Sequence, residues 1–173
     1  MFMFFALQFS EGLNKLYVNR DVPCPVTFQT AIPARFVGQF YVRAHLSFTK
    51  LEHQSKPVVT CPNDAHMGRL MQCEHPEAEY QTCGIHQIVR FPLDCCKGGV
   101  LYAITNFKFT CHSTHFLANQ RDIQFHFELE DSRYDPKGIL VAERLMDLKI
   151  CASPGRDIKN EEEKKGIVYV PGQ

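Results

Sequence analysis

The chain has 173 residues, of which 45% are hydrophobic and 22% are charged, which is the composition of an ordinary globular protein rather than a disordered one. It contains no run of eighteen apolar residues, so the sequence predicts no membrane-spanning helix and no membrane partner. Nineteen basic residues balance nineteen acidic ones, which weakens the case for a nucleic-acid partner but leaves room for a local basic face. The length favours one domain.

The apolar stretch 1–9 opens the chain. It lacks the basic segment and the small-residue cleavage site of a secretory signal peptide, so we expect it to form a buried strand. The chain also carries eight cysteines. Without a secretory signal, we expect these cysteines to be free thiols or metal ligands rather than disulfides.

Alternation of apolar and polar residues is the dominant pattern, and it predicts strands that each bury one face. The strict alternations cover 39–49, 100–111 and 123–130, and weaker strand signals cover 25–29, 87–91 and 141–151. Segment 51–82 shows no such period and is expected to be a long loop, which in a compact domain usually needs an anchor or a function. A series of strands with little helical pattern predicts an all-β sandwich.

One helix is expected, at 154–165. Ser153 suits the N-cap, Pro154 suits the first helical position, and Asp157 favours the positive end of the helix dipole. Gly166 is a natural stop.

Two Cys–His pairs lie in distant segments. Cys61 and His66 fall in the long loop, whereas Cys111 and His115 follow a strong strand. Together they could supply the four ligands of a structural zinc ion and pin two loops that have little apolar surface. With eight cysteines and eight histidines, however, nearby pairs arise easily by chance. Spacing alone therefore favours a chance pairing over a metal site.

Other residues compete for these roles. Asp64 stands three residues after Cys61 and could ligate through a carboxylate oxygen, whereas His112 is too close to Cys111 in sequence for good geometry. A Cys/His hydrolase would need a thiolate, a base and an orienting group in one pocket. The nearest local pairs, Cys73 with His75 and Cys83 with His86, belong to no catalytic motif, so we expect no enzyme.

The segment 150–157, ICASPGRD, followed by the glutamates at 161–163, is similar to the signature strand–turn–helix of the p53 tumour-suppressor transcription factors. Further matches run in the same order along the chain: Leu13-Asn14-Lys15, Cys24-Pro25-Val26, Val42-Arg43-Ala44, Cys61-Pro62, Phe91-Pro92, Phe109-Thr110-Cys111 and Leu129-Glu130-Asp131. The resemblance covers roughly 13–165.

The resemblance implies an all-β, immunoglobulin-like β-sandwich with a loop–sheet–helix motif, long zinc-bridged loops and one C-terminal helix. The domain would cover 1–166, with 167–173 as a C-terminal tail. The chain would begin near the family's second strand, which leaves the first strand missing and an edge unpaired.

The family binds zinc through three cysteines and one histidine. By that match Cys61 and Cys111 carry over directly, and His115 stands where the family has its last cysteine. Asp64 keeps the family's spacing for the remaining ligand, but His66 has the better chemistry, and we favour His66.

The family places its final helix in the major groove of double-stranded DNA, where an arginine near the helix start reads guanine. Arg156 matches that arginine, Lys149 matches a phosphate-contacting arginine, and Lys159 is a further candidate for phosphate. Ala152 and Ser153 match the small residues that lie against the bases.

The minor-groove loop matches the family least well. The best alignment puts Gln120 at the groove-inserting arginine, and a shift of one residue gives that role to Arg121. Ser113 is a candidate for a phosphate contact.

By resemblance, the expected function is sequence-specific DNA binding in the nucleus, and alternatively also the cytoplasm, to regulate transcription in stress response and apoptosis. The expected protein partners are further copies of the chain or relatives of the same family. The alternative is a diverged protein-interaction module that binds DNA weakly and modulates full-length relatives.

Overall fold

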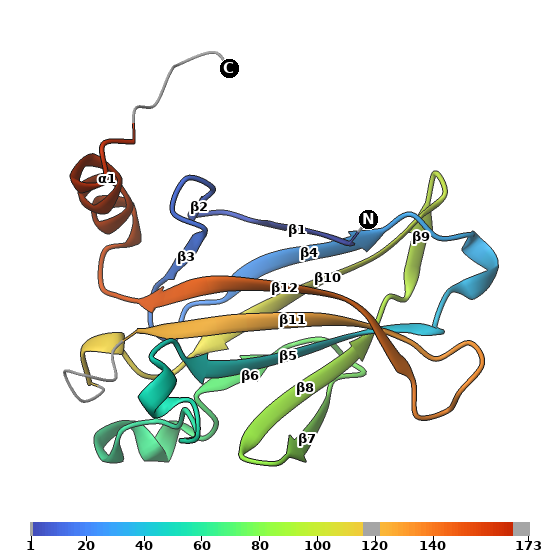
Figure 1. The fold of residues 1–173 in the computed structure, drawn as a ribbon, viewed down its shortest axis with the longest axis horizontal. Coiled ribbons are helices and arrows are strands. Elements are labelled where there is room, and N and C mark those ends of the chain that lie inside the picture. The colour runs from blue at the N-terminus through green and yellow to red at the C-terminus, as the bar shows by residue number, and fades with distance from the viewer. Residues whose placement is uncertain (1, 116–121, 168–173) are drawn as a thin grey trace.

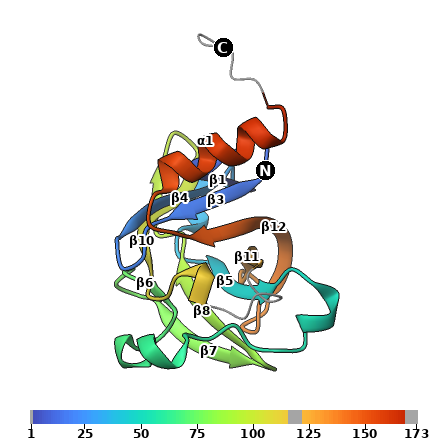
Figure 2. The same ribbon diagram turned by 90° about the vertical axis from the view of Figure 1, so that its left-hand side faces the viewer.

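The computed structural model describes residues 2–115 and 122–167, which form two β-sheets packed face to face, with one α-helix near the C-terminal end (Figures 1 and 2). In chain order the strands are β1 (Phe2–Ala6), β2 (Phe9–Ser10), β3 (Lys15–Val18), β4 (Cys24–Thr30), β5 (Phe40–Phe48), β6 (Met71–Cys73), β7 (Glu79–Cys83), β8 (His86–Pro92), β9 (Cys95–Lys97), β10 (Val100–Phe109), β11 (Ile123–Asp131) and β12 (Ile139–Ile150). The helix is α1 (Pro154–Lys164). The expected all-β sandwich is confirmed.

Among the described residues, the smaller sheet runs β1-β4-β10-β6, with β9 also paired to β10. The larger sheet runs β2-β3-β12-β11-β5-β8-β7. β3 and β12 pair in parallel, and the other described pairs are antiparallel. The strictly alternating segments became β5, β10 and β11, and the weaker ones became β4, β8 and β12, because each can turn one row of apolar side chains toward the other sheet.

Aromatic rings from both sheets form the centre of the core. Phe28 of β4 lies 4.7 Å from Phe127 of β11, and Phe107 of β10 lies 5.3 Å from Phe125 of β11, measured between ring centroids. All four rings are fully buried, and both contacts are edge-on, the arrangement that aromatic pairs favour. This packing holds the two sheets together.

The expected long loop at 51–82 contains strands, which corrects that prediction. β6 has three residues, too few to set a period, and β7 is exposed along its whole length at the edge of its sheet, so it carries no apolar alternation. The opening segment also differs from one buried strand. It forms β1 and β2 with Gln8 at a φ of 60° between them, and β1 lies at a sheet edge with Phe5 exposed.

The helix α1 begins at the expected residue. Ser153 occupies the N-cap position, although its side chain makes no capping hydrogen bond. Several side-chain contacts join α1 to the larger sheet, among them Ser10 Oγ, which donates to Glu162 Oε1 at 2.6 Å, and Lys15 Nζ, which lies 3.1 Å from Glu161 Oε1. One face of the helix is therefore anchored to the sheet, while its other face is open to solvent. None of the described helices has the length and apolar character needed to cross a bilayer.

We expect Phe127→Ala to lower the free energy of unfolding by about 3–5 kcal/mol, because it empties the centre of the aromatic core. Urea denaturation followed by circular dichroism measures this loss. The control is Ile104→Ala on β10, where the side chain is 62% exposed and removal should cost less than about 0.5 kcal/mol. Equal losses of unfolding free energy in the two variants would contradict the central place of Phe127 in the core.

Candidate functional site

Two segments from different parts of the chain meet at one end of the sandwich. Cys61 immediately precedes a short 3-10 helix, Pro62–Met67, and Asp64 lies in its first turn. The backbone amide of Asp64 donates to the carbonyl of Cys61 at 3.1 Å, so this tight turn brings the carboxylate back over the sulfur. The first segment therefore presents a thiol and a carboxylate side by side.

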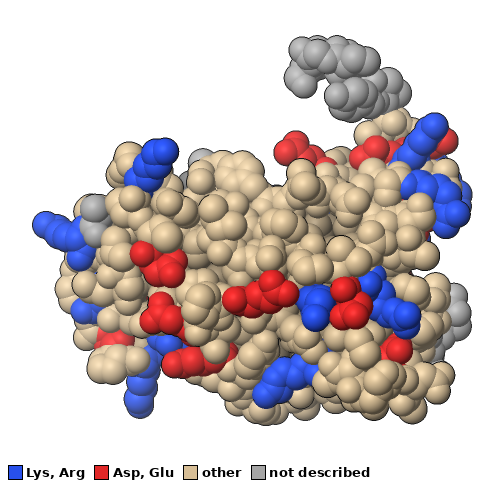
Figure 3. Space-filling model, turned by 180° about the vertical axis from the view of Figure 1, so that it is seen from behind, with Lys and Arg blue, Asp and Glu red and all other residues tan. Residues whose placement is uncertain are grey.

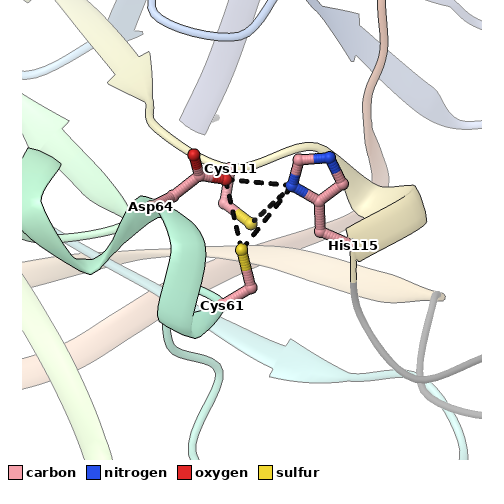
Figure 4. A group of neighbouring side chains, drawn as sticks. All are labelled: Cys61, Asp64, Cys111 and His115. Atoms are coloured by element: carbon pink, nitrogen blue, oxygen red, sulfur yellow. Dashed lines mark hydrogen bonds and ion pairs between the residues drawn. The ribbon is translucent and has the colours of Figure 1, made fainter.

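The second segment follows β10. Cys111 is fully buried just past the end of that strand, and His115 ends a second 3-10 helix, Ser113–His115. The Nδ1 atom of His115 lies 3.7 Å from Cys111 Sγ, 3.6 Å from Cys61 Sγ and 2.9 Å from Asp64 Oδ2. Figure 4 shows the four side chains pointing toward one another.

The donor atoms of Cys61, Asp64, Cys111 and His115 all lie within 4.8 Å of one another, and the group could hold a metal ion. A tetrahedral zinc ion with Zn–S bonds of about 2.3 Å and Zn–N bonds of about 2.0 Å places sulfur and nitrogen ligands about 3.5 Å apart. The two sulfur–nitrogen distances around His115 are close to this value. Two sulfurs, one imidazole and one carboxylate also make a suitable donor set for zinc, so the residues present fit the ion.

The protonation of these groups follows from their contacts. Hydrogen bonds from His115 first, and then from Cys61, lower the pKa of Asp64 to about 2, so its carboxylate is ionised at neutral pH. Burial raises the pKa of Cys111 to about 12, which keeps that thiol protonated in the metal-free protein. A bound cation would have to displace the thiol proton, since the thiolate is the form that ligates.

Arg20 is a residue of the candidate site that the sequence patterns did not reveal. Its Nη1 atom lies 3.4 Å from Asp64 Oδ1, which leaves the other carboxylate oxygen, Oδ2, facing the donor group. The next residue, Asp21, donates its amide to the carbonyl of Phe109 at 2.6 Å and so fixes this turn beside the end of β10. No local motif marks Arg20, because the contact exists only in the folded chain.

His66 lies outside the donor group and is exposed. The geometry therefore favours Asp64 over His66 as the fourth ligand, contrary to the expectation from sequence. Spacing is the reason, since the 3-10 turn that returns Asp64 to Cys61 leaves His66 two residues farther along, facing solvent. His112 is also outside the group, and its ring centroid lies 5.4 Å from that of His115.

The end of β12 and the start of α1 carry most of the residues expected to contact DNA. The Arg156 side chain is 69% exposed, and its Nε atom lies 3.6 Å from Asp157 Oδ1. Ala152 and Lys159 are also exposed, and Ser153 is half-buried. Basic and acidic side chains are interspersed on the face shown in Figure 3, rather than gathered into one basic surface.

Lys149 is held by carboxylates of α1. Its Nζ atom lies 3.2 Å from Asp157 Oδ2 and 3.6 Å from Glu161 Oε1. Burial lowers the pKa of Lys149, but these two carboxylates outweigh it and raise the pKa overall, so the ammonium stays charged. The expected phosphate contact would therefore compete with two carboxylates.

Ser113 is buried, and its Oγ accepts a hydrogen bond from the amide of Ile150 at 2.9 Å. It therefore joins the 3-10 helix of His115 to the end of β12, a position that favours a structural role over the expected phosphate contact. Gln120 and Arg121, the two candidates for the minor groove, lie outside the described residues.

The family model described as P53 DNA-binding domain matches residues 5–165. Three relatives called cellular tumor antigen p53 come from Xenopus laevis (26% identity over 92% of this chain and 47% of that protein), Oryzias latipes (28%, 91% and 46%) and Ictalurus punctatus (29%, 89% and 43%). The chain thus spans less than half the length of these curated relatives. The resemblance expected from the sequence is confirmed, and the chain belongs to the p53 DNA-binding domain family.

Proposed function

We propose that this protein binds double-stranded DNA in a sequence-specific manner through the start of α1 and regulates transcription in the nucleus. The observation that carries the proposal is the exposed guanidinium of Arg156 at the start of a helix that is anchored to the sandwich. Arginine reads guanine by a bidentate pair, which needs both exposure and a fixed base. Family membership supports the choice of DNA as partner, and by analogy stress response and apoptosis as the programmes controlled.

The proposed domain comprises 1–166, with 167–173 as a tail. Within it, we propose that Cys61, Asp64, Cys111 and His115 hold a structural zinc ion and that Arg20 orients the carboxylate of Asp64. Such an ion cross-links loops that bury little apolar surface of their own. A zinc ion with four protein ligands has no open position for a substrate. We therefore propose a binding protein and not an enzyme.

A second candidate function is a protein-interaction module that pairs with relatives or with further copies of the chain. The ion pairs of Lys149 favour it, because a lysine already neutralised by Asp157 and Glu161 contributes less to phosphate binding. Relative affinity for specific and unspecific DNA separates the two candidates.

We expect Arg156→Ala to weaken binding to a p53-type response element by about 1–3 kcal/mol, roughly 5- to 150-fold, because the base contact is lost. Binding to a scrambled duplex should change much less. Fluorescence anisotropy at several salt concentrations measures both. Lys164→Ala, at the far end of α1, serves as the control and should affect the two duplexes equally. Equal affinity of the unaltered protein for both duplexes would support the interaction module instead.

We expect Asp157→Asn to strengthen DNA binding and to steepen the dependence of log affinity on log salt by up to about 0.9, because it frees Lys149 to neutralise one more phosphate. The same anisotropy titrations test this. Glu163→Gln changes the net charge equally on an exposed part of α1 and is the matched control. If the two variants behave alike, the ion pair of Lys149 does not restrain binding.

We expect Asp64→Ala to weaken zinc binding by more than about 10–100-fold, the loss typical of removing an outer-shell partner, since Asp64 supplies a ligand atom. Competition with a chromophoric chelator measures the affinity. Arg20→Gln should fall within that smaller range, because it removes only the partner of Asp64. His66→Ala should leave zinc binding unchanged, and a large loss in this variant would restore His66 as the fourth ligand.

A further inference from the structure

Three histidines from three neighbouring strands gather on the outer face of the larger sheet. His45 lies on β5, His86 on β8 and His126 on β11, and the sheet order places β5 between the other two strands. On β5 the residues on either side of His45, Ala44 and Leu46, belong to the buried core, so the alternation of the strand turns His45 outward. None of the three histidines belongs to the Cys61 donor group or to α1.

The three rings are in contact. His45 and His126 are direct partners across β5 and β11, and their ring centroids are 4.4 Å apart with the planes inclined by 16°. The ring of His86 lies 4.9 Å from that of His45. Directly opposed residues on neighbouring antiparallel strands have Cβ atoms about 4.5–5.5 Å apart, close enough for two side chains to share one ligand.

Each ring has a nitrogen available to bind. Among the described residues, the Nδ1 atoms of His45 and His86 are buried and have no hydrogen-bond partner. The Nε2 atom of His126 lies 2.6 Å from Ser47 Oγ, and donation of its proton to that oxygen leaves Nδ1 of His126 with a free lone pair. Buried polar atoms normally have partners, so two such atoms on neighbouring rings favour a site that binds a ligand.

The charge state also suits a cation. Burial, followed by the proximity of His126, His86 and Arg43, lowers the pKa of His45 to about 3, and burial likewise lowers the pKa of His126. At neutral pH the imidazoles of His45 and His126 are therefore uncharged, and protons do not compete for their lone pairs.

Acidic residues lie on the same face. Glu128 is the direct partner of Arg43 across β5 and β11, and Glu143 is the partner of Glu128 on β12. These carboxylates offset the guanidinium charge of Arg43, which would otherwise disfavour a cation beside His45.

We propose that His45, His86 and His126 form a second metal site, which binds a divalent transition-metal ion such as Zn²⁺ through three imidazole nitrogens. Imidazole suits zinc, copper and nickel ions, and a three-histidine set leaves a fourth position for water. Among the described residues, only the Cys61 group already has its donor atoms within 4.8 Å of one another, so binding here requires the three rings to rotate out of their stack. The bound ion then clamps β8, β5 and β11.

Titration of the metal-free protein with Co²⁺ tests the site, because cobalt reports its ligands by colour. Binding at Cys61 and Cys111 gives a thiolate-to-cobalt charge-transfer band, whereas binding at the histidines gives visible d–d absorption without that band. We expect two equivalents, of which only one adds charge-transfer intensity, and two zinc ions per chain by elemental analysis after loading with Zn²⁺ and removal of excess. A single equivalent for either metal overturns the proposal, whatever the variants do.

The variants His86→Gln and His126→Gln locate the second equivalent. Each should lose the equivalent without charge transfer and keep the one with it, which also shows that the domain is still folded. Gln87→Ala is the matched control, because Gln87 is an exposed residue next to His86. This variant should keep both equivalents of metal. Retention of both equivalents in the two histidine variants overturns the assignment to these residues.

Discussion

The convergence of Cys61, Asp64, Cys111 and His115 connects the loops of this protein to its helix. Two segments with little apolar surface are brought into register by these four side chains. From there Ser113, two residues before His115, accepts the amide of Ile150, the last residue of β12. Because α1 begins only a few residues later, a continuous series of contacts runs from the four side chains to the exposed start of the helix.

Charge is distributed so that the tip of α1 is nearly balanced. The chain has no net charge, and Lys149 at the end of β12 already has two carboxylate partners. Affinity for a polyanion then depends on exchanging one set of ion pairs for another, and not on attraction at long range. A surface of this kind favours binding that depends on the shape of the partner over non-specific electrostatic binding to any nucleic acid.

Period-two patterns predicted the long strands correctly because β5, β10 and β11 bury one complete row of side chains each. The pattern missed β6, which is only three residues long, and β7, whose five residues are all exposed. Spacing together with the family resemblance selected Cys61, Cys111 and His115, which the structure brings together, but choosing between Asp64 and His66 required the local 3-10 turn. Arg20 was out of reach, since no sequence rule brings a residue from one turn to a carboxylate in another loop.

The parallel pairing of β3 with β12 joins residues near opposite ends of the described chain. Contacts of such high sequence separation carry a large loop-closure cost and tend to form late in folding. During synthesis, β12 cannot find this neighbour until nearly the whole domain has left the ribosome. Helix α1, which follows β12, is thus assembled last, and a partly made chain cannot hold it in its final position.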